Sequence, residues 1–249
     1  MTIRLGLLGV VLLVTMPALA GVWAADSVQL SWSNRNDPTP LSPPKLQLEA
    51  LPESVRAAIK TVQEHPCLTA KGPAETFNAD PNVYRWLLEH PELGVRMWRQ
   101  LGARVTDIYE QSPGVYRWQD DHGSDLHWYT VYRGPGLHVW YAEGKVKPNL
   151  LVPLTPFRCI VMLRYLEGKD ATGKSAIKHQ AYFQLHCERG LLALATRLLG
   201  ASAPRLTEQY LGQLQMFYGG LAWYLGQDEQ HAKTLYQKVG LIQATPTMP

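Results

Sequence analysis

The chain has 249 residues, three cysteines, and 24 Lys and Arg against 21 Asp and Glu, a formal net charge of +3. The basic residues form no block, so the sequence does not indicate a nucleic-acid partner. Eight Trp and twelve Tyr against four Phe give aromatic rings that mostly carry a polar atom, which suits core edges and ligand pockets equally.

Residues 1–24 have the layout of a secretory signal peptide. A short basic start is followed by an apolar run of ten residues, 5–14, then by Pro17 and by small-residue motifs that end at Ala20 and Ala24. A bilayer-spanning helix needs about 20 apolar residues. We therefore expect cleavage near Ala20 or Ala24 and export to the periplasm or the outside, with no stable transmembrane anchor. A retained anchor or a buried N-terminal strand is the alternative.

Residues 25–50 contain four prolines and no clear period, which predicts a linker or a surface-draped arm. Residues 51–66 then place Val55, Ile59 and Val62 on one side of a predicted N-terminal helix that Pro66 ends. We expect residues 72–240 to form a single domain and residues 241–249 to be a loose tail.

A second helix is predicted to begin at Asp80 and Pro81, because Asp is a capping residue and Pro is tolerated at the first helical position. Pro91 divides the helical pattern in two and Gly102 closes it. After Gly102 the apolar period changes from 3.6 to 2. Strands are predicted over residues 105–108, 115–118, 126–133, 137–141, 157–165 and 177–185.

Each of the last two predicted strands carries an apolar face, which includes Cys159 on the first and His179 on the second. The alternate residues of the second strand, within 178–186, are polar enough to predict a solvent-exposed face. One apolar sheet face needs a cover, and the stripe from Leu206 to Leu225 on a long C-terminal helix is the best available. The predicted fold class is α+β, with an antiparallel sheet of five or six strands gripping that helix.

The stretch ETFNADPNVYRWLL, residues 75–88, reads as a short strand, an acidic-proline turn and a first helix. A second helix, a strand meander and a long C-terminal helix follow it. This order resembles the START and polyketide-cyclase-like helix-grip superfamily over about residues 72–226. The resemblance implies a curved antiparallel sheet that holds apolar ligands against the long helix, and only a minority of members are enzymes.

The turn at residues 133–136 sets the predicted register of the hairpin around it. If Arg133 and Gly136 flank the turn, Trp128 falls opposite Tyr141 and Tyr132 falls opposite Leu137. Together with residues from the last strand and the long helix, these rings form the predicted ligand-binding set: Trp128, Tyr132, Tyr141, His179 and Phe217.

The leading hypothesis is an exported protein that binds a hydrophobic small molecule or lipid. A rival is an enzyme in which His179 and a nearby Tyr act as acid and base. His179 on an apolar strand face also suits a core histidine with a hydrogen-bond partner. A third hypothesis is a cell-envelope structural or interaction module without a ligand. His127 and His138 are predicted to be solvated.

Two motifs are interpreted as turns. Residues Gly168 to Ser175 match G-x-x-x-x-G-K-[ST], but a phosphate-binding loop needs a helix after it, and the alternation that follows predicts a strand. We therefore expect no nucleotide there. Residues 120–125 gather oxygen ligands and an imidazole, yet lack the spacing of a calcium loop. No metal or other cofactor is predicted.

The cysteines allow at most one bridge, and free cysteines are the default. If Val161 pairs with Ala181, Cys159 lies opposite Phe183, and Cys187 is four residues farther, roughly 13 Å along the strand. A disulfide needs Cα atoms about 4.4–6.8 Å apart. Cys159 and Cys187 are therefore predicted not to bridge each other, and whether Cys67 forms a disulfide is left open.

Overall fold

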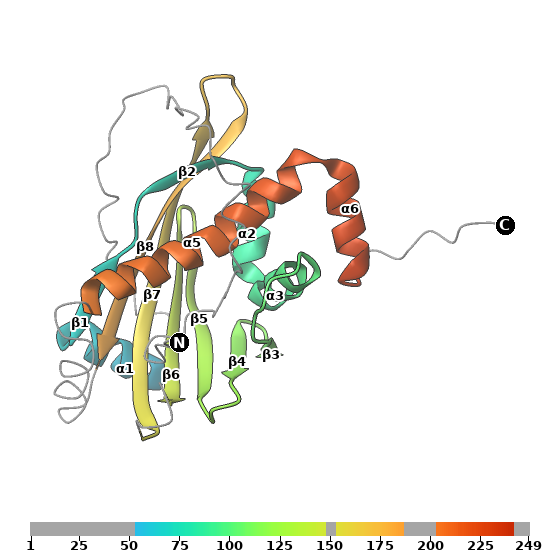
Figure 1. The fold of residues 1–249 in the computed structure, drawn as a ribbon. Coiled ribbons are helices and arrows are strands. Elements are labelled where there is room, and N and C mark those ends of the chain that lie inside the picture. Colours follow the sequence, from blue (N-terminus) through green and yellow to red (C-terminus); the bar gives the residue numbers. More distant parts are fainter. Residues whose placement is uncertain (1–52, 148–152, 187–202, 242–249) are drawn as a thin grey trace.

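The computed structural model describes residues 53–147, 153–186 and 203–241, without the side chains of residues 203–206. It confirms the α+β class: an antiparallel sheet packs against a C-terminal helix of 25 residues (Figure 1). The sheet has eight strands, two more than the upper expectation, in the order β1-β8-β7-β6-β5-β4-β3, with β2 also pairing β8. The strands are β1 (Leu68–Lys71), β2 (Glu75–Asn78), β3 (Ile108–Ser112), β4 (Val115–Gln119), β5 (Asp125–Gly134), β6 (Leu137–Val146), β7 (Thr155–Lys169) and β8 (Ser175–His186).

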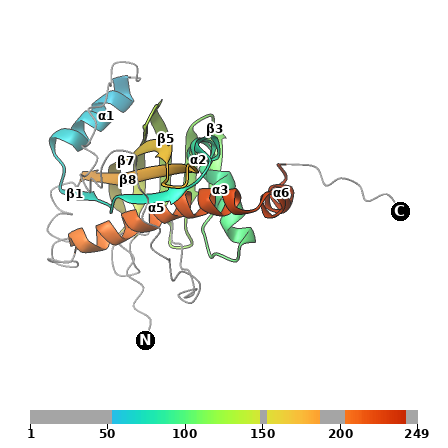
Figure 2. The same ribbon diagram turned by 90° about the horizontal axis from the view of Figure 1, so that it is seen from above.

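The helices lie on both sides of the sheet, as Figure 2 shows. On one side lie α2 (Pro81–Glu89), α3 (Pro91–Gln100) and α5 (Ala203–Gln227), followed by α6 (Glu229–Lys238), and on the other lies α1 (Glu53–Glu64). The predicted start of α2 is confirmed, because the Asp80 side chain accepts a hydrogen bond from the Asn82 backbone N–H at 2.7 Å. Among the described residues, none of the helices is both long and apolar enough to cross a bilayer.

The main core lies between the sheet and α5. It takes the predicted inward faces of β7 and β8, including Cys159 and Phe183, and the apolar stripe of α5, including Phe217 and Leu221. The helix approaches closely at Gly219, where an added Cβ would lie 2.9 Å from the Phe77 ring. The same Cβ would lie 3.1 Å from the His179 ring, so α5 is tightly packed against β2 and β8 at this point.

The opposite face of the sheet is covered as well, so the prediction of a wet face on β8 is wrong at its centre. Ile59 and Val62 of α1 are fully buried against Tyr141 and Ile160, and Gln180 and Tyr182 on β8 are only 3% and 7% exposed. Alternation along a strand shows which residues share a face. It does not show that a separate amphipathic helix will dock there.

The predicted register of the β5–β6 hairpin is wrong because the turn lies at a different place and because β5 contains a bulge. The turn is flanked by Gly134 and Leu137, and the register shifts between Thr130 and Tyr132. Trp128 therefore pairs with Ala142 and Tyr132 with Val139. One extra residue in a strand reverses the face of every residue beyond it, so Tyr132 points to the α1 side and Trp128 to the α5 side.

The segment from Gly168 to Ser175 forms the β7–β8 hairpin turn, and residues 175–186 are strand rather than helix. The Asp170 carboxylate accepts hydrogen bonds from the backbone N–H groups of Thr172 and Lys174, at 2.8 and 2.9 Å. Hydrogen bonds from Thr172, Asn78 and this backbone lower the pKa of Asp170 to about 2. The residues that mimic a phosphate-binding loop are thus those that a tight polar turn needs.

Residues 120–125 form the corresponding turn between β4 and β5. The Asp120 carboxylate accepts from the backbone N–H groups of His122 and Ser124, at 2.9 and 2.8 Å. Within the described part of the chain, no group of three or more His, Cys, Asp and Glu side chains is placed to hold a metal ion.

The register of β7 with β8 differs from the prediction by two residues, since Val161 pairs with Phe183 and Cys159 with Leu185. The faces are nevertheless as predicted, because a slip of two preserves alternation. Cys159 is a buried free thiol, as expected of a residue that does not bridge, and Cys67 is disulfide-bonded. Cys187 lies outside the described residues.

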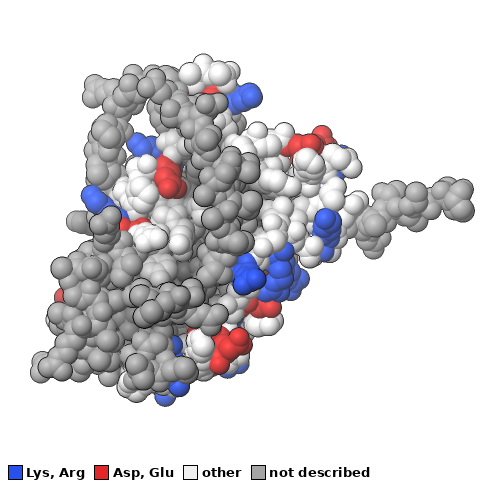
Figure 3. Space-filling view, in the orientation of Figure 1, with Lys and Arg blue, Asp and Glu red and all other residues white. Residues whose placement is uncertain are grey.

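The visible surface carries charge of both signs. On the face shown in Figure 3, Lys and Arg side chains and Asp and Glu side chains occur in several separate places over the described elements. This distribution agrees with the nearly balanced composition of the chain.

Candidate functional site

The face of β4, β5 and β6 that lies toward α5 is unusually rich in large aromatic rings. Trp118 on β4 and Trp140 on β6 are 3% and 4% exposed, and Trp128 on β5 packs against the same core. Trp140 stacks on Tyr218 of α5, with ring centroids 5.7 Å apart and planes 9° apart. We call Trp118, Trp128, Trp140 and Tyr218 the aromatic face.

Polar atoms on or beside the aromatic face lack partners. The indole N–H groups of Trp118 and Trp128, the hydroxyl of Thr130 and one carboxylate oxygen of Glu92 are buried without a hydrogen-bond partner among the described residues. Buried polar side-chain atoms in folded proteins are hydrogen-bonded in the large majority of cases. Several such atoms in one region therefore mark it as a place where another molecule can supply the partners.

The charge state of this region is set by burial. Burial raises the pKa of the Glu92 carboxyl group. Burial also raises the pKa of the Tyr218 hydroxyl, and electrostatic repulsion from Tyr116 and Glu92 raises it further. The Tyr116 hydroxyl is held in place because it donates to the Glu89 carbonyl at 2.7 Å. The region thus favours neutral groups and offers mainly hydrogen-bond donors.

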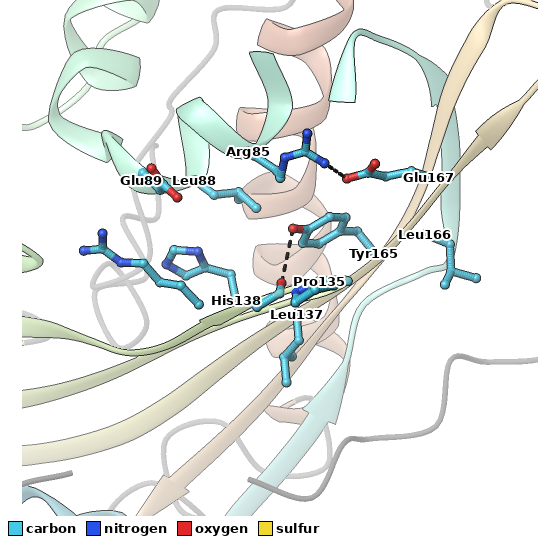
Figure 4. A pocket seen from close by; sticks show the side chains of 12 residues that line it. Arg85, Leu88, Glu89, Pro135, Leu137, His138, Tyr165, Leu166 and Glu167 are labelled. Carbon is cyan, nitrogen blue, oxygen red and sulfur yellow. Dashed lines mark hydrogen bonds and ion pairs between the residues drawn. The ribbon is translucent and has the colours of Figure 1, made fainter. Parts of the chain in front are cut away.

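A groove of about 640 Å³ opens beside this region, between α2 and the turn that joins β5 to β6 (Figure 4). Leu88 and Tyr165, 1% and 3% exposed, supply apolar wall. Arg85 at the rim pairs with Glu167 and donates to Asn82 at 2.6 Å. The groove is lined by Arg85, Leu88, Glu89, Arg133, Gly134, Pro135, Gly136, Leu137, His138, Tyr165, Leu166 and Glu167.

His138 lies in the groove and is 3% exposed, so the prediction that it is solvated is wrong. Its ring packs against Trp140, with centroids 4.2 Å apart and planes inclined by 34°, and Nε2 has no partner in the described part of the chain. Burial, and after it the charge of Arg133, lower the pKa of His138 to about 3, so the imidazole is neutral. The neighbours of His138 along β6, Leu137 and Val139, pack toward α1, so the His138 side chain lies on the α5 side of the sheet and is covered there.

His179 belongs to a different, closed network. Its Nδ1 lies 2.8 Å from the Tyr84 hydroxyl and its Nε2 lies 3.2 Å from a Glu75 carboxylate oxygen. Both His179 and Tyr84 are 0% exposed, and Phe77 packs edge-on to the imidazole at 4.8 Å. Because both ring nitrogens have partners and the ring has no exposed surface, this geometry favours a core histidine over an acid or base that meets a substrate.

The structure separates the five side chains of the predicted ligand-binding set. Trp128, His179 and Phe217 lie on the α5 side of the sheet, and Tyr132 and Tyr141 pack on the α1 side. Phe217 packs beside Trp98 of α3, at 6.2 Å between centroids. None of the five lines the groove. Of this set, Trp128 is the member that belongs to the aromatic face.

The depressed pKa of His138 predicts a pH-dependent loss of stability. The unfolded chain binds a proton below the ordinary pKa of about 6.5, but the folded chain does so only near 3, so stability falls as the pH drops through that window. We expect the free energy of unfolding of the wild type to fall by about 2 kcal/mol more than that of His138→Gln between pH 6.5 and 4.5. Urea unfolding at a series of pH values measures this difference.

The comparison between wild type and variant isolates His138 from other groups. Burial also lowers the pKa of His179 and raises that of Glu92, but both residues are present in both proteins. His127→Gln, a change on the neighbouring strand, should leave the wild-type slope unchanged. If the free energies of unfolding of the wild type and His138→Gln depended on pH in the same way, the depressed pKa of His138 would be contradicted.

Comparisons with known proteins give weak likenesses. No family model and no curated protein matches the chain. The di-domain ARO/CYC BexL from the BE-7585A biosynthetic pathway is 16% identical with a TM-score of 0.41, over 70% of this chain and 55% of that one. A conserved protein from Geobacillus kaustophilus is 10% identical with a TM-score of 0.38, over 61% of this chain and 96% of that one. A protein from Rhizobium leguminosarum is 17% identical with a TM-score of 0.36, over 61% and 93%.

Proposed function

We propose that the chain is an exported protein that binds a hydrophobic small molecule or lipid between the sheet and α5, against the aromatic face. The observation that carries the proposal is the group of buried polar atoms without partners among the described residues, on Glu92, Trp118, Trp128 and Thr130. Leaving such an atom unpaired costs about 1–3 kcal/mol. A bound molecule that accepts hydrogen bonds from the two indole N–H groups would recover that cost for them.

The chemistry of these groups defines the ligand. An indole N–H can only donate, a threonine hydroxyl can donate or accept, and a carboxyl group with a raised pKa donates when protonated. Stacked aromatic rings supply the rest of the surface. The ligand that fits is an apolar molecule, preferably flat, with one or two acceptor oxygens such as a ketone, an ester or a hydroxyl group.

Two features support export. The first 24 residues have the layout of a signal peptide. Cys67 is disulfide-bonded, and disulfides persist mainly in oxidising compartments such as the periplasm and the extracellular space.

Binding of the neutral fluorescent ketone prodan tests the proposed site. We expect saturable binding with a blue shift of the probe emission, and an affinity about 3- to 10-fold weaker in Trp118→Phe or Trp128→Phe, since each change removes one donor of about 0.5–1.5 kcal/mol. Trp86→Phe is the matched control, because Trp86 stacks on His90 of the α2–α3 corner at 5.0 Å. Equal affinities in all three variants, or no saturable binding, would refute the site.

Native mass spectrometry of the protein purified from its own host identifies the natural ligand. We expect an adduct that denaturation releases and that is depleted in the Trp118→Phe, Trp128→Phe double variant. A bare polypeptide mass together with absent prodan binding would instead favour a structural module in which water satisfies the buried donors.

A further inference from the structure

The floor of the groove carries a cross-strand pair of nitrogen-bearing side chains. Arg133 on β5 and His138 on β6 are direct register partners, so they share a face of the sheet and lie side by side. We propose that this groove is a second binding site, separate from the aromatic face, and that it takes a small aromatic carboxylate whose anionic group lies against Arg133 and His138.

Arg133 supplies the positive charge for this site. The other guanidinium of the groove, that of Arg85, already pairs with Glu167 and donates to Asn82. Arg133 has no ion-pair partner among the residues that the structure describes. A guanidinium presents a planar set of donors that matches a carboxylate with two parallel hydrogen bonds.

His138 supplies a second polar group at the same position. Its Nε2 is buried and unpartnered within the described ranges, in a side chain that lines the groove and is 3% exposed. A neutral imidazole donates one hydrogen bond and accepts one. In Figure 4 the His138 ring is drawn below the level of Arg85 and Glu89. A carboxylate seated at Arg133 would accept from the imidazole as well.

The remaining wall fits a flat apolar body. Leu88 of α2 and the Tyr165 ring of β7 are both nearly fully buried, and Tyr165 packs on Tyr84 at 5.4 Å between centroids, which fixes its orientation. A cavity of about 640 Å³ is in the range of small-molecule sites, about 300–1,000 Å³. A bicyclic aromatic ring has room there with its carboxylate at one end.

The charges also set the direction in which the ligand lies. Glu89, the last residue of α2, carries a negative charge on the wall opposite the β5–β6 turn, and a helix C-terminus adds partial negative charge. The carboxylate therefore faces the turn, and the ring system lies toward Leu88. Glu89→Gln should strengthen binding of an anion about 2-fold.

Isothermal titration with 2-naphthoate and with 2-naphthamide tests the site, because the two molecules have nearly the same shape and differ in charge. We expect naphthoate to bind at least 10-fold more tightly than naphthamide. Arg133→Gln and His138→Phe should each weaken naphthoate binding 5-fold or more and leave naphthamide binding within 2-fold. Arg104→Gln, an exposed arginine outside the groove, is the matched control.

The two proposed sites can be told apart with the same reagents. Trp118→Phe should leave naphthoate affinity within 2-fold, and prodan should not displace naphthoate. If prodan displaces naphthoate and Trp118→Phe no longer binds naphthoate, then naphthoate binds at the aromatic face. That result would refute the groove proposal and leave the proposed function intact. Equal affinities for naphthoate and naphthamide, or no heat of binding at millimolar concentration, would also overturn the groove proposal. Neither of these results bears on prodan binding at the aromatic face.

Discussion

Replacing Cys67 with serine should lower the free energy of unfolding by about 3–5 kcal/mol. Cys67 is disulfide-bonded and Cys159 is a free thiol. The sequence holds one further cysteine, Cys187, so we expect a Cys67–Cys187 bridge that closes a loop of about 120 residues. The Cys67 backbone N–H donates to the Leu185 carbonyl at 2.8 Å, which places Cys67 at the end of β8. Cross-linking so long a loop removes much conformational freedom from the unfolded chain.

Guanidinium unfolding with and without reductant measures the effect. The wild type under reducing conditions should become as unstable as Cys67→Ser, whereas the variant itself should not respond to reductant. A peptide map of the denatured, unreduced protein should show Cys67 linked to Cys187 and label on Cys159 alone. Labelling of all three thiols, or a variant as stable as the oxidised wild type, would contradict the expected bridge.

Gln215→Leu should cost about 3 kcal/mol of stability, although it replaces a buried polar side chain by an apolar one of similar size. Gln215 is 0% exposed, its side-chain oxygen accepts from the Ala181 backbone N–H at 3.1 Å, and its amide donates to the Pro73 carbonyl at 2.7 Å. Ala181 lies in the gap along β8 between the stretch that pairs β1 and the stretch that pairs β2. The change would leave a backbone donor and acceptor without their present partners, at about 1–3 kcal/mol each.

Gln213→Leu is the matched control, because Gln213 lies one half-turn away on the same helix and is partly exposed. We expect its stability to stay within about 0.5 kcal/mol of the wild type. Gly72→Ala should reproduce part of the Gln215→Leu loss, since a Cβ at Gly72 would overlap the Gln215 side-chain oxygen. If Gln215→Leu has the same urea midpoint of unfolding as the wild type, the hydrogen bond from the Ala181 backbone N–H to Gln215 of α5 does not stabilise the fold.

The parts of the fold that could be predicted are those encoded by local chemistry. The start of α2 follows from Asp80 and Pro81, and the hairpin at residues 168–175 follows from its turn residues and the alternation after it. The inward faces of β7 and β8 followed from strict period-2 patterns. Each of these signals is contained in fewer than about ten consecutive residues, so no long-range contact is needed to read it.

The parts that could not be predicted depend on contacts between distant segments. The bulge near Val131 leaves no signature in the alternation of β5, yet it puts Tyr132 and Trp128 on opposite faces of the sheet. The position of the turn, between Gly134 and Leu137, pairs Arg133 with His138. The strand sequences likewise contain no pattern that predicts the docking of α1 on the second face of the sheet. The aromatic face was anticipated only through Trp128, because its other members come from β4, β6 and α5.

The pairing of β1 and β2 with β8 has a consequence for how the chain folds. Glu75 and His179 are partners across 104 residues. Strands β1 and β2 therefore cannot pair until β8 has formed. Strands β3 to β8 form a meander that can grow hairpin by hairpin, but closing a loop of that length is slow. Until it closes, the outer edge of β8 is an open template for strands of other chains. The stage at which this protein is most exposed to misassociation is therefore the completion of its sheet, not the beginning.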